Sequence, residues 1–173
     1  MPSRLHNQQV LALLIDAENA RCSLTPQLLR RAACYGDLAV KRAYADWTRP
    51  DMRSRQALLQ RYAIEPVHYF RYATGKNSAD MSLAVDAMAL ANTGQFDGVG
   101  IASSDSDFTP LAIQLRMQGL RVYGFGEQHT PMSFVQACTR FIYVETLVGH
   151  EKGPFQPPEV RRRRTAPGPA CSR

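Results

Sequence analysis

The sequence contains no apolar run of 18 residues, so it offers no candidate transmembrane helix. Its first apolar stretch, LALLI, has five residues and is too short for the core of a signal peptide. Cysteine is scarce, with four residues and no C-x-x-C pair, and the four histidines are scattered. A zinc site needs clustered ligands, so we expect reduced, structural thiols. These absences favour a soluble, cytoplasmic protein without a membrane partner.

Motifs of several enzyme classes are also missing. The chain has neither G-x-G-x-x-G nor G-x-x-x-x-G-K-[ST], so a dinucleotide site and a P-loop nucleotide site are both unsupported. It has no G-x-S-x-G nucleophile elbow either. Any catalysis must therefore depend on residues outside these motifs.

The positive charge is concentrated at one end of the chain. The net charge of the 173 residues is +6, yet residues 1–150 are close to neutral. Residues 151–173 contain five prolines and four consecutive arginines, a composition that cannot build a core. We expect one folded domain over 1–150 and a basic, Pro/Arg-rich disordered tail over 151–173. The arginine run would bind polyanions without sequence preference.

Short apolar segments alternate with amphipathic ones along residues 8–148. Strands are predicted at 10–15, 38–45, 64–70, 98–103, 120–126 and 141–145. Helices are predicted from Thr25 to the residue before Gly36, and at 51–62, 78–91, 109–117 and 132–138. This alternation predicts an α/β fold with a mostly parallel sheet flanked by helices.

Acidic side chains follow three of the predicted strands. Asp16 closes the first strand, and Asn19 lies in the same turn. Asp105 and Asp107 follow the fourth strand, whereas Asp80 opens the long helix after the third. Because the carboxyl ends of parallel strands lie on one side of a sheet, these acids converge if the three strands are near neighbours.

Several carboxylates in a small volume need a compensating cation. Oxygen ligands without cysteine or clustered histidine favour Mg²⁺ or Mn²⁺. Such an ion can polarise a phosphate and lower the pKa of a bound water, so the residue types point to phosphodiester hydrolysis. The alternative is structural: a single aspartate after a strand is commonly a turn former or a helix cap, and Asp107 precedes a helix start at Thr109-Pro110.

Further polar residues are candidates around this cluster. Asp86 lies six residues after Asp80, about 120° round the helix, so we interpret it as a supporting or structural residue. Lys76, Arg42 and Arg71 are candidate phosphate ligands, with solvated surface charges as the alternative interpretation. Several aromatic residues either stack on bases or pack in the core.

Four long segments, in this order, resemble one known family. They read LALLIDAEN, KNSADMSLAVDAM, GVGIASSDSDFTPLAIQLRMQGLRVYGFG and TPMSFVQACTRFIYVE. Together they are similar to NYN domains of the LabA-like group, which belong to the PIN-like nuclease superfamily. The resemblance covers about residues 8–147.

The resemblance implies a Rossmann-like (PIN-like) sheet and an acidic pocket for Mg²⁺ or Mn²⁺. It also implies metal-dependent RNA cleavage, with site segments matching Asp16 and Asn19, then Asp80, then Asp105 and Asp107. Ser104 and Asp86 also match family positions, as a small residue beside the acids and as a further acid. The K-N-S-A-D segment differs in length from the usual Lys-Gly-Val-Asp, which affects the placement of Lys76.

Two functions from different classes follow from these features. The first is a ribonuclease, expected to be an endoribonuclease, that hydrolyses RNA phosphodiester bonds by a metal-activated water. The second is a non-catalytic RNA-binding or regulatory protein on the same fold, favoured by the lack of an added RNA-binding module in these residues. A phosphatase would share the metal chemistry but would need an enclosed pocket. The sequence leaves the oligomeric state open, a dimer included.

Overall fold

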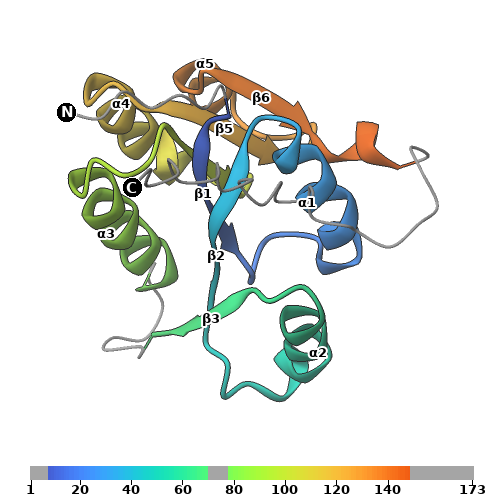
Figure 1. Ribbon diagram of the computed structural model, residues 1–173. Helices are drawn as coiled ribbons and strands as arrows, with labels where there is room; N and C mark the ends of the chain where they lie inside the picture. Colours follow the sequence, from blue (N-terminus) through green and yellow to red (C-terminus); the bar gives the residue numbers. More distant parts are fainter. Residues whose placement is uncertain (1–7, 70–77, 149–173) are drawn as a thin grey trace, which may run out of the picture.

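Strand β1 (Val10–Asp16) lies inside a six-stranded parallel sheet with the order β3-β2-β1-β4-β5-β6 (Figure 1). The computed structural model describes residues 8–69 and 78–148. The other strands are β2 (Asp37–Ala45), β3 (Glu65–His68), β4 (Gly98–Ala102), β5 (Arg121–Gly126) and β6 (Arg140–Tyr143). The helices are α1 (Thr25–Ala33), α2 (Arg53–Arg61), α3 (Ser78–Asn92), α4 (Thr109–Met117) and α5 (Met132–Ala137).

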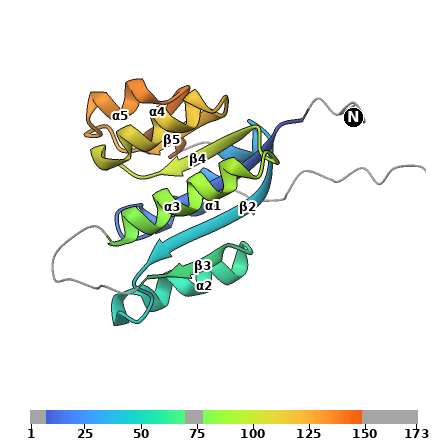
Figure 2. The same ribbon diagram turned by 90° about the vertical axis from the view of Figure 1, so that its left-hand side faces the viewer.

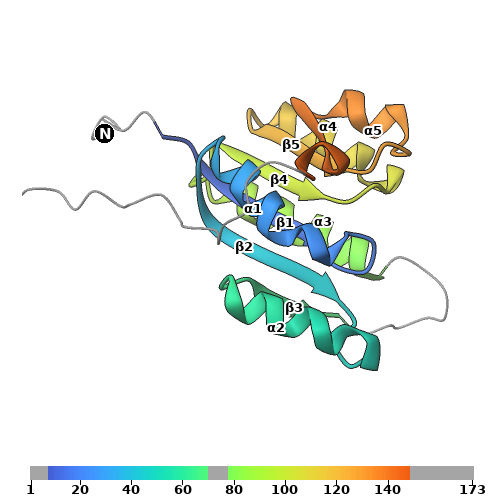
Figure 3. The same cartoon turned by 90° about the vertical axis from the view of Figure 1, so that its right-hand side faces the viewer.

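The helices form one layer on each face of the sheet. Helices α3, α4 and α5 cover one face (Figure 2), and α1 and α2 cover the other (Figure 3). Both faces are therefore buried, which explains why β1 and β4 read as nearly continuous apolar runs.

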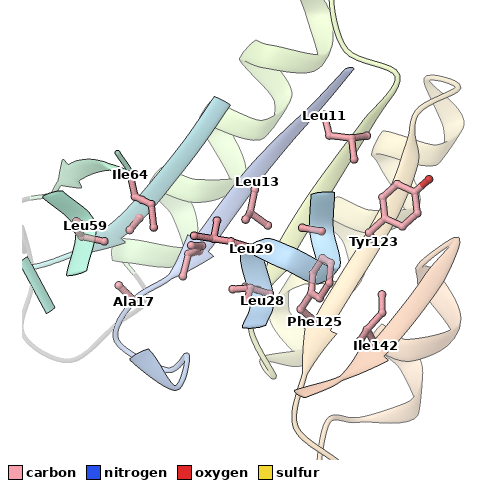
Figure 4. Packing of buried hydrophobic residues seen from close by; sticks show 14 of the residues in the cluster. Leu11, Leu13, Ala17, Leu28, Leu29, Leu59, Ile64, Tyr123, Phe125 and Ile142 are labelled. Atoms are coloured by element: carbon pink, nitrogen blue, oxygen red, sulfur yellow. The ribbon is translucent and has the colours of Figure 1, made fainter. Parts of the chain in front are cut away.

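Successive β1 residues point to opposite layers, as the period of two requires. Leu11 and Leu13 pack with Leu29 of α1 in the first core, drawn in Figure 4. Leu14 packs with Leu83 of α3 in the second core. Strand β1 is thus anchored on both sides, so its last residue has a fixed position.

Two glycines end helices at positions where a side chain would be strained. Gly94 follows α3 with φ 65°, and Gly119 follows α4 with φ 86°. Only glycine adopts such angles at little cost, so these residues stop the helices and return the chain toward the sheet.

The predicted α/β fold is confirmed, with small differences at the ends of elements. Strand β6 ends at Tyr143, because residues 144–147 form a 3-10 turn. The predicted helix at 51–62 begins with a 3-10 turn, Pro50–Met52, before α2. Strand β3 has four residues, fewer than predicted, and residue 70 lies outside the described part. The predicted tail over 151–173 also lies outside it. Within the described ranges, no helix has the length and apolar character needed to cross a bilayer.

Candidate functional site

The acidic residues lie where the parallel strands end, and we call this carboxyl-terminal end of the sheet the acidic edge. Strands β1 and β4 are neighbours. The strand that follows β1 lies on one side of this pair and the strand that follows β4 lies on the other, so the strand order reverses between them. Asp16 is the last residue of β1, and Asp105 follows β4 by a short turn. Such switch points are where open α/β sheets bind ligands.

Asp80 reaches this edge by a different route from the one expected. The condition that the first, third and fourth strands are near neighbours is met only in part, because β4 lies beside β1 but β2 separates β3 from β1. Instead, α3 packs across β1 and β2, and its first turn carries Asp80 to the ends of the strands (Figures 2 and 3).

Three carboxylates form a tight group at this edge. Asp80, Asp105 and Asp107 each have an oxygen within 4.8 Å of the others. Asp107 is exposed, and the other two are partly buried, so the group opens to solvent. Asp105 also organises its own turn, since its Oδ1 accepts a hydrogen bond from the Asp107 backbone N–H at 2.8 Å. Asp105, and not Asp107, is therefore the capping residue of the 3-10 turn before α4.

Asp16 lies behind this group and is held by three donors. Only 1% of its surface is exposed. Its Oδ2 accepts hydrogen bonds from Asn19 Nδ2 and Ser103 Oγ, each at 2.8 Å, and its Oδ1 accepts one from the Asn19 backbone N–H at 3.3 Å. Burial raises the pKa of Asp16, while these hydrogen bonds oppose the rise. Asn19 thus orients the carboxylate of Asp16 from the same turn.

The charges of the group act most strongly on Asp80. Burial, followed by the negative charges of Asp16, Asp105, Asp107 and Glu18, raises the pKa of Asp80 to about 6. Burial is the first cause of this rise, and the repulsion from the neighbouring carboxylates adds to it.

Glu18 belongs to the same edge, although the sequence did not single it out. Its Oε1 accepts a hydrogen bond from the Tyr69 hydroxyl at 2.6 Å and lies 3.5 Å from a guanidinium nitrogen of Arg49. The one available signal was its place two residues after Asp16, between that acid and Asn19.

Of the two adjacent serines after β4, Ser103 contacts the acids and Ser104 contacts a backbone amide. Ser104, expected beside the acids, accepts a hydrogen bond from the Glu127 backbone N–H at 2.8 Å. Ser103 makes the contact with Asp16, and its Oγ also accepts the Asp105 backbone N–H at 3.1 Å. Ser103 therefore links the ends of β1 and β4, a role that sequence reasoning missed.

Asp86 and Arg42 lie in a separate network on the α3 side of β2. One Arg42 nitrogen lies 2.8 Å from Asp86 Oδ1, and its Nε lies 2.7 Å from Glu65 Oε2. The Tyr44 hydroxyl donates to Asp86, and burial together with this bond raises the pKa of Tyr44. Hydrogen bonds and charge from Glu65 and Asp86 raise the pKa of Arg42. These pairings favour a structural role for both residues. Lys76 and Arg71 lie outside the described residues.

Replacing Ser103 with alanine is expected to raise the pKa of Asp16 further. The variant removes a hydrogen-bond donor to a buried carboxylate, at a cost of about 2 kcal/mol in unfolding free energy at neutral pH. A carboxyl-carbon NMR titration of Asp16 measures the pKa, and urea unfolding measures the stability. Ser104→Ala is the matched control, because Ser104 Oγ bonds Glu127 and not Asp16. Equal Asp16 titrations in the two variants would contradict the linking role of Ser103.

The donor set of the site fits a hard divalent cation. Every ligand atom in the group is a carboxylate oxygen, the chemistry that Mg²⁺ and Mn²⁺ prefer. The pKa of Asp80 is raised by burial and also by repulsion from the neighbouring carboxylates, and such a cation would relieve this repulsion. Two described arginines near this edge are paired with acids, Arg49 with Asp51 at 2.7 Å and Arg21 with Glu127 at 2.8 Å, whereas Arg55 donates to the Ala17 carbonyl.

Comparisons with known proteins give the domain family and similar folds. The NYN domain model matches residues 10–145, which is most of the chain. A crystal structure of a Vibrio parahaemolyticus protein of unknown function is similar at a TM-score of 0.68 and 19% sequence identity, covering 83% of this chain and 96% of that one. At this identity the likeness shows the fold alone. A search of curated proteins finds no match.

Proposed function

This chain belongs to the NYN domain family, a family of PIN-like nucleases, and we propose on that premise that it is a divalent-metal-dependent endoribonuclease. The observation that supports this proposal most directly is the group of carboxylates of Asp80, Asp105 and Asp107 at the switch point of the sheet. The substrate is proposed to be RNA, and we further propose, from the resemblance of the sequence segments described above, that the chain is a member of the LabA-like group.

Each residue of the site has a proposed role in this reaction. Asp80, Asp105 and Asp107 hold Mg²⁺ or Mn²⁺ through their clustered oxygens. Asp16 completes the acid set from the end of β1, and Asn19 and Ser103 orient its carboxylate. Asp86 and Ser104 support the surrounding structure by the contacts described above.

The chemistry divides between the metal and the protein. A bound Mg²⁺ or Mn²⁺ supplies Lewis-acid polarisation of the phosphate and lowers the pKa of an attacking water. The chain itself positions four carboxyl groups at one edge, from β1, α3 and the turn after β4, and leaves the outer face of the group open for a long polymer. A phosphatase of small molecules would need an enclosed pocket, whereas Asp107 is exposed.

The test is cleavage of an internally labelled single-stranded RNA in Mn²⁺ or Mg²⁺. Internal cuts that disappear in excess chelator are expected from the wild-type protein. Asp105→Asn is expected to slow cleavage on the order of a thousandfold, because the charge that holds the cation is lost. Asp51→Asn is the control, since Asp51 lies at the surface in a pair with Arg49. Cleavage that persists in chelator or in Asp105→Asn would rule out the metal mechanism.

The second candidate is an RNA-binding or regulatory protein without catalytic activity. It shares the fold and the site, so only activity separates the two. RNA binding without cleavage in Mg²⁺, Mn²⁺ or any other divalent metal would favour this candidate and overturn the first.

A further inference from the structure

A group of arginines surrounds two stacked tyrosines at the amino-terminal ends of the strands, which is the end of the sheet opposite the acidic edge. The rings of Tyr35 and Tyr123 stack with centroids 4.5 Å apart. Tyr35 follows α1, and Tyr123 points from β5 into the same layer. The guanidinium carbons of Arg31 and Arg140 lie 5.4 and 5.6 Å from the centre of the Tyr35 ring. One aromatic ring therefore holds two cations from distant parts of the chain.

A third arginine joins this group from the first residue of β5. When the side-chain amide of Gln9 is oriented with its oxygen toward Arg121, that oxygen accepts two hydrogen bonds from the guanidinium, at 3.0 and 3.2 Å. The amide nitrogen then donates to the Tyr35 carbonyl and the Tyr123 hydroxyl. Arg121 is thereby fixed against the tyrosine pair. We call Arg31, Arg121 and Arg140 the arginine group.

No member of the arginine group has a carboxylate partner among the described residues. Arg21, Arg42 and Arg49 are each paired with an acid. By contrast, no ion pair to Arg31, Arg121 or Arg140 is formed by the described residues. All three are exposed at the surface. Three neighbouring cations that form no salt bridge with the described residues can bind an anion with more than one negative group.

The charge distribution indicates which anion this is. When no metal is bound, the carboxylates at the acidic edge repel the phosphates of a nucleic acid, so metal-free binding needs a cationic surface elsewhere. Strand β1, with seven residues at about 3.3 Å each, sets a separation of about 20 Å between the two edges. A single phosphate monoester could not span that distance, whereas a polynucleotide could.

We propose that the arginine group is an RNA-anchoring site. It binds backbone phosphates of the same RNA molecule that is cut at the acidic edge. Arg31 and Arg140, held on Tyr35, contact the phosphates directly, and Arg121 adds the third charge. The identification of the polyanion as RNA rests on the proposed function. The anchoring site itself depends only on the arginine group and its lack of carboxylate partners.

The first experiment measures binding of a labelled single-stranded RNA of about twenty nucleotides in chelator, by fluorescence anisotropy at several salt concentrations. We expect the double variant R31Q/R140Q to bind about tenfold more weakly. The slope of log K against log salt should fall by about 1.4, because each lost phosphate contact on a single strand contributes about 0.7. The charge-preserving variant R31K/R140K should restore most of the affinity.

The matched control removes the same charge elsewhere. Arg61 ends α2 and Arg116 lies in the last turn of α4, both exposed and outside the arginine group. R61Q/R116Q should change the affinity by less than about twofold. An equal loss in both double variants would show an effect of net charge and overturn the anchoring site. Should R31Q/R140Q fail to fold, Arg31→Gln alone, on the exposed face of α1, is measured in the same way.

A second readout separates this inference from the nuclease proposal. With Mn²⁺, R31Q/R140Q should cleave a trinucleotide at the wild-type rate, since so short a substrate cannot reach the arginine group, but should cleave the long RNA more slowly at low concentration. If the wild-type protein cuts no RNA while R31Q/R140Q still loses binding, the nuclease proposal fails and the anchoring site stands. If the wild-type protein cuts RNA and R31Q/R140Q binds and cuts equally well, the anchoring site is overturned.

Discussion

Asp80→Asn is expected to stabilise the metal-free protein while removing its cleavage activity. In the metal-free site, burial and the neighbouring carboxylates disfavour the ionised form of Asp80. Asparagine keeps the shape of the side chain without the charge, so the repulsion disappears. The same change removes one oxygen anion from the proposed metal site, and cleavage should fall on the order of a thousandfold.

The stability gain should depend on pH in a defined direction. Because the pKa of Asp80 is about 6 in the folded protein and 3.8 in its ordinary state, the folded protein binds the proton more tightly. Wild-type stability should therefore fall as the pH rises from about 4 to about 6, and remain lower above that. The upper limit is about 3 kcal/mol, and solvent screening at this partly exposed group reduces it to about 1 kcal/mol.

Thermal unfolding in chelator, measured from pH 4 to pH 8, tests this prediction. Asp80→Asn should unfold at a higher temperature than the wild-type protein above pH 6 and at the same temperature near pH 4. Saturating Mn²⁺ should reverse the order, because binding to the folded state stabilises the wild-type protein selectively. A variant that is less stable in chelator at pH 8, or that still gains stability from Mn²⁺ as the wild type does, would contradict the repulsion at this site.

Asp86→Ala is expected to cause a large loss of stability without changing the metal site. Asp86 accepts from Arg42 and from Tyr44, whose side chain is fully buried. Removing the carboxylate leaves a half-buried guanidinium and a buried hydroxyl without this partner. Breaking such a pair from one side costs about 3 kcal/mol.

A control on the same arginine separates burial from charge. Glu65 also pairs with Arg42, but its side chain is 60% exposed, so Glu65→Ala should cost less than about 1 kcal/mol. Urea unfolding measures both variants. Calorimetric titration with Mn²⁺, under conditions where Asp86→Ala is folded, should show wild-type affinity. Lost Mn²⁺ affinity with unchanged stability would instead place Asp86 among the metal ligands, as its match to a family acid allows.

The fold was readable from the sequence because its signals are local. Apolar runs buried on both faces, together with turn and cap residues such as Pro26 and Gly119, predicted nearly every element within a few residues. The weakest prediction was β3, which is an edge strand and contains Pro66, a residue that cannot donate a hydrogen bond to a neighbouring strand. The 3-10 turns at helix starts were missed, because a single turn has no periodicity to detect.

The candidate site was only partly readable. Asp16, Asp105 and Asp107 stand directly after strands, so their placement at one edge follows from the parallel sheet. Asp80 arrives through α3, and that path depends on which strands the helix crosses. Ser103 and Ser104 are adjacent and chemically identical, so only the orientation of the backbone after β4 decides which of them contacts Asp16.

The amino-acid sequence alone determined the alternation of strands and helices, the burial of the central strands and the acids at their ends, because each depends on residues close together in the chain. The tertiary structure decided the strand order, the route by which Asp80 joins the carboxylate group, the pairing of Arg42 with Asp86, and the arginine group across the sheet. These depend on contacts between residues that are far apart in sequence, and such contacts exist only once the layers have packed.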